Sequence, residues 1–80
     1  MPIAFVLIKV HFGGETEVLE QLKGIDTLKE AHIVFGSADI IAKLESDDRQ
    51  QIEQAIIWKI RKLTKVADTF TNWVHKSAYK

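Results

Sequence analysis

Hydrophobic and polar positions divide the first part of the chain into a strand and a helix. Residues 3–12 form an apolar run rich in β-branched and aromatic side chains, which is typical of a strand, and the Gly13–Gly14 pair ends it. Residues 15–23 then space their hydrophobic side chains along one face of a helix, with acids in the first turn and Gly24 as the stop. This part of the chain therefore predicts a strand that leads directly into a short helix.

The pattern that follows predicts a hairpin, a longer helix and a last strand. Residues 28–35 and 39–45 are typical of two strands, and the glycine-containing turn 36–38 between them is short enough for a hairpin. A second helix is expected to end near Thr64. Residues 67–76 alternate enough to form the final strand.

Two features of the second helix follow from its sequence. Asp47 is expected to cap its N-terminus, because Gln50 follows three residues later as in a capping box. A hydrophobic stripe runs along one side of the helix and consists of Ile52, Ile56, Ile60 and Leu63. Ile57 and Trp58 lie off that stripe, so they are either a further contact surface or peripheral members of the core.

The order strand, helix, strand, strand, helix, strand predicts an α+β fold. The economical packing is one four-stranded antiparallel sheet with both helices on one face, which is the ferredoxin-like βαββαβ arrangement. A mixed open sheet with a helix on each face is the alternative, and it leaves each helix covered by very few residues. No linker or low-complexity segment interrupts the 80 residues, so residues 1–80 are expected to form a single domain.

The first strand is apolar on both faces, which predicts an oligomer. Its even-numbered positions suit the face that the helices cover, and they are Ala4, Val6, Ile8, Val10 and Phe12. Its odd-numbered positions begin with Ile3, Phe5 and Leu7, and they need cover from outside the subunit because both helices occupy the other face. We therefore expect a homodimer formed by packing two sheets face to face. Self-association also adds stability to a chain this small.

Composition excludes several classes of function. The chain has no cysteine, which rules out disulfides and cysteine-based metal centres. Its eleven basic residues balance eleven acidic ones, so no net field attracts nucleic acid. The apolar run at the N-terminus is too short to cross a bilayer and has neither a charged n-region nor a cleavage site. These observations predict a soluble, cytoplasmic protein that binds neither nucleic acid nor membrane directly.

The polar residues do not form a catalytic or metal-binding pattern. His11, His32 and His75 lack the spacing of a metal site, and in the predicted topology His11 and His75 lie at opposite ends of neighbouring strands. Ser37 has no histidine near it in sequence, and a hairpin tip is not a nucleophile elbow. We therefore expect no metal, no cofactor and no enzyme activity.

One turn and one strand offer groups for a small polar ligand. The turn at residues 36–39 presents free backbone groups and the Asp39 carboxylate, while Thr69 and Thr71 present hydroxyls on one side of the last strand. If these groups lie close together, turn amides bind a carboxylate, Asp39 binds an amine and the hydroxyls fix orientation, which suits a free amino acid. The plain alternatives are that Asp39 caps the turn and that the threonines reflect β-propensity.

At these residues the chain resembles the RAM domain, the effector-binding half of Lrp/AsnC-type transcription regulators. The resemblance covers nearly all 80 residues. It rests on the patterns Ala-x-x-Val-x-Gly-x-x-Asp-Ile at 31–40, Lys-Ile-Arg-Lys-Leu at 59–63 and Asp-Thr-x-Thr at 68–71. It implies a ferredoxin-like fold, dimers closed through their sheets as a dimeric α/β barrel, and assembly of these dimers into octamers or decamers. It also implies amino-acid effectors bound between neighbouring dimers.

Carried over by position, the resemblance implies a set of ligand-binding residues. These are Gly36, Ser37, Ala38, Asp39, Thr69, Thr71 and the apolar pocket residue Ile33. Ser37 and Ala38 stand where the family commonly has an acid and an aromatic residue, and Asn72 and Trp73 interrupt its usual aliphatic run. These departures point to a different ligand or to none.

The chain opens directly on its first strand, whereas full regulators place a helix-turn-helix domain ahead of this one, so it resembles the stand-alone members of the family. We expect a non-enzymatic module of transcription regulation that binds a small molecule, forms oligomers and acts on full-length Lrp/AsnC regulators. One alternative is a pure protein-interaction module without a ligand. The other is a small dimeric α/β-barrel enzyme such as a cofactor-free monooxygenase.

Overall fold

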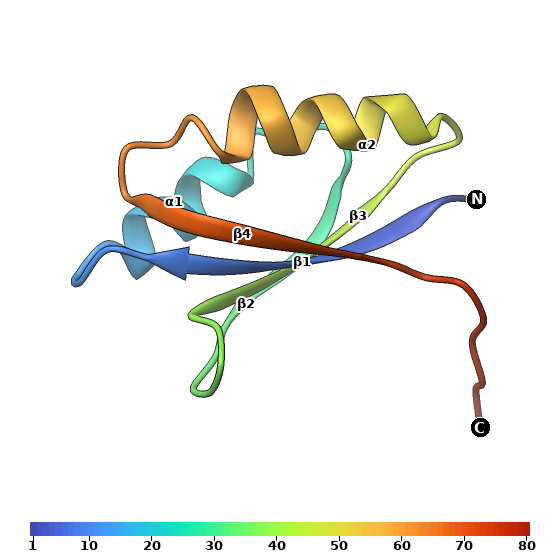
Figure 1. Cartoon of the computed structure of the whole chain (residues 1–80), viewed down its shortest axis with the longest axis horizontal. Coiled ribbons are helices and arrows are strands. Elements are labelled where there is room, and N and C mark those ends of the chain that lie inside the picture. The colour runs from blue at the N-terminus through green and yellow to red at the C-terminus, as the bar shows by residue number, and fades with distance from the viewer.

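The computed structural model describes all 80 residues and places both helices on one face of a four-stranded antiparallel sheet (Figure 1). The strands are β1 (Ile3–Val10), β2 (Leu28–Ile33), β3 (Ile40–Glu45) and β4 (Val66–Trp73), and their order in the sheet is β2-β3-β1-β4. The helices are α1 (Glu15–Leu22) and α2 (Arg49–Ala55), and α2 continues as a π-helical segment, η1 (Ile56–Ile60). The predicted ferredoxin-like α+β fold is confirmed.

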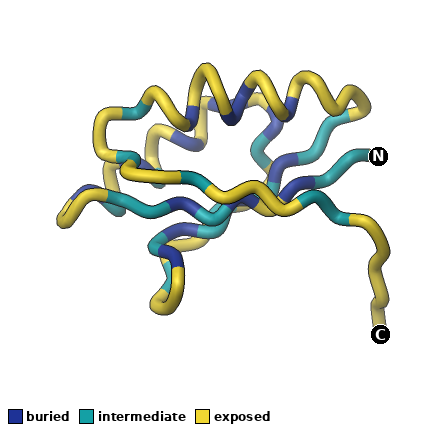
Figure 2. The backbone as a smooth tube through the Cα atoms, in the orientation of Figure 1, coloured by how far each residue is buried: buried dark blue, intermediate teal, exposed yellow.

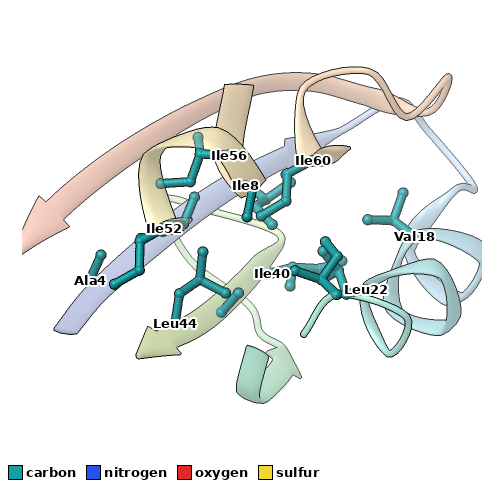
Figure 3. Close-up of a cluster of buried hydrophobic side chains, with 13 residues drawn as sticks. Ala4, Ile8, Val18, Leu22, Ile40, Leu44, Ile52, Ile56 and Ile60 are labelled. Carbon is teal, nitrogen blue, oxygen red and sulfur yellow. The ribbon is translucent and has the colours of Figure 1, made fainter. Parts of the chain in front are cut away.

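The core fills the space between the sheet and the helices (Figure 3). Alternate residues of β1 and β3 point into it, and the fully buried ones are Ala4, Val6, Ile8, Ile40, Ala42 and Leu44. The helices contribute Val18, Leu22, Ile52, Ile56 and Ile60. The predicted stripe of the second helix is therefore confirmed as its core-facing side, and Leu63 packs at its margin. Figure 2 shows the same division, with exposed residues at the hairpin tip and in the C-terminal segment.

The π-helical segment keeps the isoleucine stripe turned toward the sheet. The backbone N–H of Arg61 donates to the carbonyl of Ile56 at 2.9 Å, five residues back. Ile52, Ile56 and Ile60 recur every four residues, and this spacing drifts around a helix of 3.6 residues per turn. The wider π turn takes up the drift. As a result Ile60 is as completely buried as Ile52.

Several strand and helix ends differ from the sequence prediction. β2 ends at Ile33, two residues before the predicted end, and β4 ends at Trp73, three residues before it. β1 ends at Val10, where its pairing with β4 shifts at a bulge, and Phe12 beyond it is fully exposed and does not face the helices. The expectation for Phe12 was therefore wrong, because the chain has already left the sheet. The second helix ends at Ile60, not near Thr64, because a tighter turn follows in which the Leu63 N–H donates to the Ile60 carbonyl at 3.1 Å.

The second helix is capped by Asp48, so the predicted cap at Asp47 was wrong. Asp48 has an extended backbone, and its carboxylate accepts a hydrogen bond from the N–H of Gln50 at 2.9 Å. Ser46 Oγ accepts from the Asp48 N–H at 3.1 Å and donates to Gln51 Oε1 at 2.9 Å. Both aspartates precede a helical run at a plausible spacing, so the choice depends on this local network.

The sheet face opposite the helices carries apolar side chains that stay partly or largely exposed in the subunit. This open apolar face consists of Ile3, Phe5, Leu7, Ile41 and Phe70. Leu7 stands at its centre, paired with Ile41 on one side and Phe70 on the other. Phe5 is 37% exposed and Phe70 is 51% exposed. The prediction that β1 is apolar on both faces is confirmed.

Candidate ligand-binding site

The turn at residues 36–39 is fastened to β1 by three hydrogen bonds. The Asp39 carboxylate accepts from the backbone N–H of Val10 at 2.8 Å, and the Asp39 N–H donates to the carbonyl of Ile8 at 3.0 Å. Lys9 Nζ donates to the carbonyl of Ser37 at 3.3 Å. One carboxylate oxygen of Asp39 therefore has a structural role. Asp39 stabilises the turn, as the alternative without a ligand expects, but the N–H that it binds belongs to β1 and not to the turn itself.

The other turn residues differ in what they can offer a ligand. Gly36 has a φ of +156°, which L side chains rarely adopt, and a Cβ there would meet nothing within 4 Å. The backbone conformation therefore favours glycine at this position. Ser37 is exposed, whereas Ala38 is only 4% exposed. At Ala38, where the sequence departs from the family pattern, the side chain is therefore small and buried from solvent.

Thr69 and Thr71 lie on the face of β4 that points toward the helices. The sheet register places them beside Ile8 and Val6, whose side chains are buried under the helices. Both threonines line a groove of about 280 Å³ between β4 and the second helix. We call it the threonine groove, and its other walls are Glu53, Ile56, Ile57, Arg61 and Trp73.

Charged and apolar side chains complete the threonine groove. Glu53 pairs with Arg49 at 3.1 Å, and the guanidinium of Arg49 lies 4.1 Å from the centroid of the Trp73 ring. Arg61 takes part in no ion pair. A free guanidinium, two hydroxyls and an apolar wall suit a ligand that has a carboxylate and an apolar portion.

Sequence reasoning missed these additional groove residues. Glu53, Ile57 and Arg61 recur every four residues, which places them on one side of the helix beside the buried isoleucine stripe. This spacing was the signal that could have found them. It needed the further knowledge that β4 lies alongside that side of the helix.

The turn and the threonine groove do not meet within one subunit. Asp39 bonds to Ile8 from one side, and Thr69 pairs with Ile8 from the other, so β1 lies between them. Two strand spacings amount to about 10 Å. No turn residue lines the threonine groove. Ile33 lies on the turn's side of β1, at the end of β2, and is 43% exposed.

The histidines are dispersed. The pairing of β1 with β4 places His11 and His75 beyond opposite ends of the two strands, as predicted. His32 Nε2 lies 3.1 Å from Glu30 Oε2 at an exposed position. No three side chains of His, Cys, Asp or Glu gather where they could hold a metal ion. Neither helix has the length and hydrophobicity needed to span a membrane.

The whole chain matches a known class of regulatory domain. The family model of the Lrp/AsnC ligand binding domain covers residues 3–80. The chain therefore belongs to the Lrp/AsnC ligand-binding domain family. The curated proteins that it matches are described as helix-turn-helix transcription regulators.

Individual relatives support the same assignment. The chain is 34% identical over 71 residues to the uncharacterized HTH-type transcriptional regulator PF0250 of Pyrococcus furiosus, a match that covers 85% of this chain and 47% of that protein. It thus spans about half the length of the curated relatives it matches. The crystal structure of FFRP-DM1 is 37% identical, with a TM-score of 0.87 over 94% of this chain and 100% of that one.

A more distant structure shares the fold alone. The transcriptional regulator NMB0573 from Neisseria meningitidis, described as a complex with L-Met, is 12% identical with a TM-score of 0.85. That match covers 99% of this chain and 53% of that one.

Proposed function

We propose that this chain is a small-molecule-binding module of transcription regulation whose effector site is completed only when subunits assemble. The observation that carries this proposal is the separation of the turn from the threonine groove by β1. If both belong to one site, a second subunit has to bring its turn to the groove. A ligand bound there stabilises the assembled state, because only that state contains the complete site.

The proposed effector is a free amino acid, and the proposed site residues are those of the turn, the two threonines and Ile33. Arg61 is available for the α-carboxylate, and Thr69 and Thr71 are available for orientation. Asp39 bonds to Val10 through Oδ2, which leaves Oδ1 for an ammonium group. The groove volume is near the lower end of the roughly 300–1,000 Å³ usual for ligand pockets, which favours a small ligand. The description of NMB0573 as an L-Met complex gives further support.

We also propose a homodimer closed through the open apolar face, with dimers assembling further into octamers or decamers. Five apolar side chains gather on that face with Leu7 at their centre, and all of them are partly or largely exposed in the single subunit. Burial of this patch in a partner removes apolar surface from water at about 25 cal/mol per Å². Substituting Phe5→Lys should therefore shift the protein to monomer in light scattering. Tyr79→Lys, at an exposed aromatic residue of the C-terminal segment, should leave the mass unchanged.

The effector role is tested by light scattering and thermal melting with each of the twenty amino acids. At least one should raise the melting temperature or change the mass of the assembly. Thr71→Val should abolish that response, whereas Thr64→Val, an exposed threonine outside the groove, should retain it. If no amino acid changes either quantity, the effector role is excluded.

A second candidate is a ligand-free interaction module that co-assembles with full-length Lrp/AsnC regulators. It is favoured by Asp39, whose carboxylate already accepts a hydrogen bond from the Val10 N–H, and by the burial of Ala38, which leaves its side chain unavailable to a ligand. Native mass spectrometry of this chain mixed with a purified full-length regulator of the same organism separates the candidates. Mixed species that form without any amino acid, together with no ligand response, would favour the second.

We propose that residues 1–80 act as one domain without catalysis. All thirteen residues of the core cluster are apolar, and Thr27 is the one buried polar side chain. A small barrel enzyme needs polar catalytic groups between the sheet and the helices. In this chain that space is filled by apolar side chains. Absence of turnover is therefore expected in assays of cofactor-free oxygenation.

A further inference from the structure

The open apolar face continues across the sheet to a titratable side chain at its β2 edge. The strand register pairs Leu7 with Phe70 on one side and with Ile41 on the other. Ile41 is paired in turn with His32. Residues paired across antiparallel strands point to the same face of the sheet. One row across all four strands therefore consists of three apolar side chains and an imidazole.

His32 has one polar partner within the subunit. Its Nε2 lies 3.1 Å from Glu30 Oε2, and the two side chains are 60% and 52% exposed. Both members of this pair are charged only when the imidazole is protonated, and histidine is the side chain that changes charge between pH 5 and 8. A pair this exposed contributes little to the stability of a single subunit. Its effect is larger where a partner covers the face.

A dimer closed through this face has to cover the sheet as far as β2. Four strands about 4.8 Å apart, each about six residues long, give a flat footprint of about 400 Å². Each partner in an interface of standard size buries about 800 Å² of accessible surface. The apolar side chains around Leu7 fill only part of the footprint. A stable dimer therefore needs the whole width of the sheet, and this width includes Glu30 and His32.

The charges on the same face do not balance while the imidazole is neutral. The strand residues that point to this side include three carboxylates and two ammonium groups, which are Glu30, Glu45, Asp68, Lys9 and Lys43. A two-fold dimer places this face against a copy of itself. Two faces with an excess of negative charge therefore meet when His32 is neutral. Protonation of His32 adds the third positive charge and removes the excess.

We propose that the homodimer interface extends to the β2 edge and that protonation of His32 strengthens it. This inference rests on the proposed dimer and adds a means of regulating it. In the covered face the protonated imidazole pairs with the Glu30 carboxylate, so that no lone carboxylate is buried. Dimer formation then takes up protons. The additional affinity is present at pH 6 and is lost as the pH rises toward 8, where the imidazole is neutral.

Analytical ultracentrifugation of serially diluted protein tests the inference, because it gives the dissociation constant of the dimer at pH 6 and at pH 8. The constant should be about two- to thirtyfold lower at pH 6, which is the range for two weak ion pairs related by the two-fold axis. His32→Gln should give the same constant at both pH values. His11→Gln and His75→Gln are the matched controls, since both residues lie beyond the ends of their strands, and they should retain the pH dependence.

Glu30→Gln tests the sign of the effect. Without this carboxylate the protonated imidazole is buried beside Ile41 as an unpaired cation, so acidification should weaken the dimer. Glu17→Gln removes the same charge from an exposed position on α1, on the other side of the sheet, and should respond to pH as the unaltered chain does.

The possible outcomes separate this inference from the proposed dimer. A dimer whose dissociation constant is the same at pH 6 and pH 8 overturns the inference and leaves the dimer standing. Retention of the pH dependence in His32→Gln also overturns it. A protein that is monomeric at both pH values overturns the inference and the dimer together.

Discussion

The carboxylate of Asp39 lies 2.8 Å from the backbone nitrogen of Val10, so a side chain of the hairpin turn completes the hydrogen bonding at the end of β1. Val10 sits at the bulge where β1 and β4 change register. The Asp39 carboxylate therefore joins the turn to the strand that separates it from the threonine groove. This relationship makes Asp39 a structural residue whether or not a ligand binds its second oxygen.

The first prediction follows from that bond. Asp39→Ala should lower the free energy of unfolding by about 1–2 kcal/mol, because it leaves the partly buried Val10 N–H without its partner. Asp39→Asn keeps an oxygen acceptor and should retain most of the stability while it removes the negative charge. Urea denaturation measures both. Equal losses for the two variants would show that the bond itself contributes little.

The cap of the second helix gives the second prediction. Asp48→Ala should cost about 0.5–2 kcal/mol of stability, because it removes the acceptor for the N–H of Gln50. Asp47→Ala is the matched control, since Asp47 is exposed, has the same charge and makes no capping bond. The difference between the two midpoints in a thermal melt measures the cap. If Asp47→Ala is the more damaging change, the cap is misassigned.

Local pattern was enough to predict the fold, because each element has its own periodicity and a clear stop. The alternation in β1 identified its buried positions Ala4, Val6 and Ile8, and the spacing of the isoleucines identified the inner side of the second helix. Errors arose where tertiary context decides. Phe12 continues the alternation of β1 but lies beyond the bulge, where the chain no longer belongs to the sheet.

The candidate site was less predictable than the fold. Sequence alone identified the turn and the threonines as polar positions, and it did not show that the turn bonds to β1 while the threonines line a groove under the second helix. In the sequence Arg61 is one of several cations near the end of the second helix, and only the position of β4 places it in the same groove as Thr69 and Thr71.

Close approach at Gly14 gives the third prediction. A Cβ at this position would lie 2.8 Å from Lys65 Cβ and 3.1 Å from Val10 Cγ1. Lys65 Cβ is attached directly to its backbone and is not the free end of a flexible side chain, so the packing around Gly14 has to shift. Gly14→Ala should therefore destabilise the protein by about 1–3 kcal/mol, as overpacking does.

Gly24→Ala provides the control for that measurement. The nearest atom to a Cβ at Gly24 is the carbonyl oxygen of Gln21 at 3.6 Å, which is an ordinary contact. Its effect should lie within about 0.5 kcal/mol of zero, as for most surface substitutions. Equal melting temperatures for the two variants would contradict the tight packing at Gly14.

The π-helical segment supports the last prediction, because it turns Ile60 into the core and leaves Ile57 at the surface. Ile60 is fully buried, whereas Ile57 is 44% exposed. Ile60→Val should cost about 0.5–1.5 kcal/mol, the usual loss for removing one buried methylene group. Ile57→Val removes the same group from a half-exposed site and should cost clearly less. If the second helix continued as a regular α-helix through this segment, Ile60 would drift from the sheet and the two losses in chemical denaturation would converge.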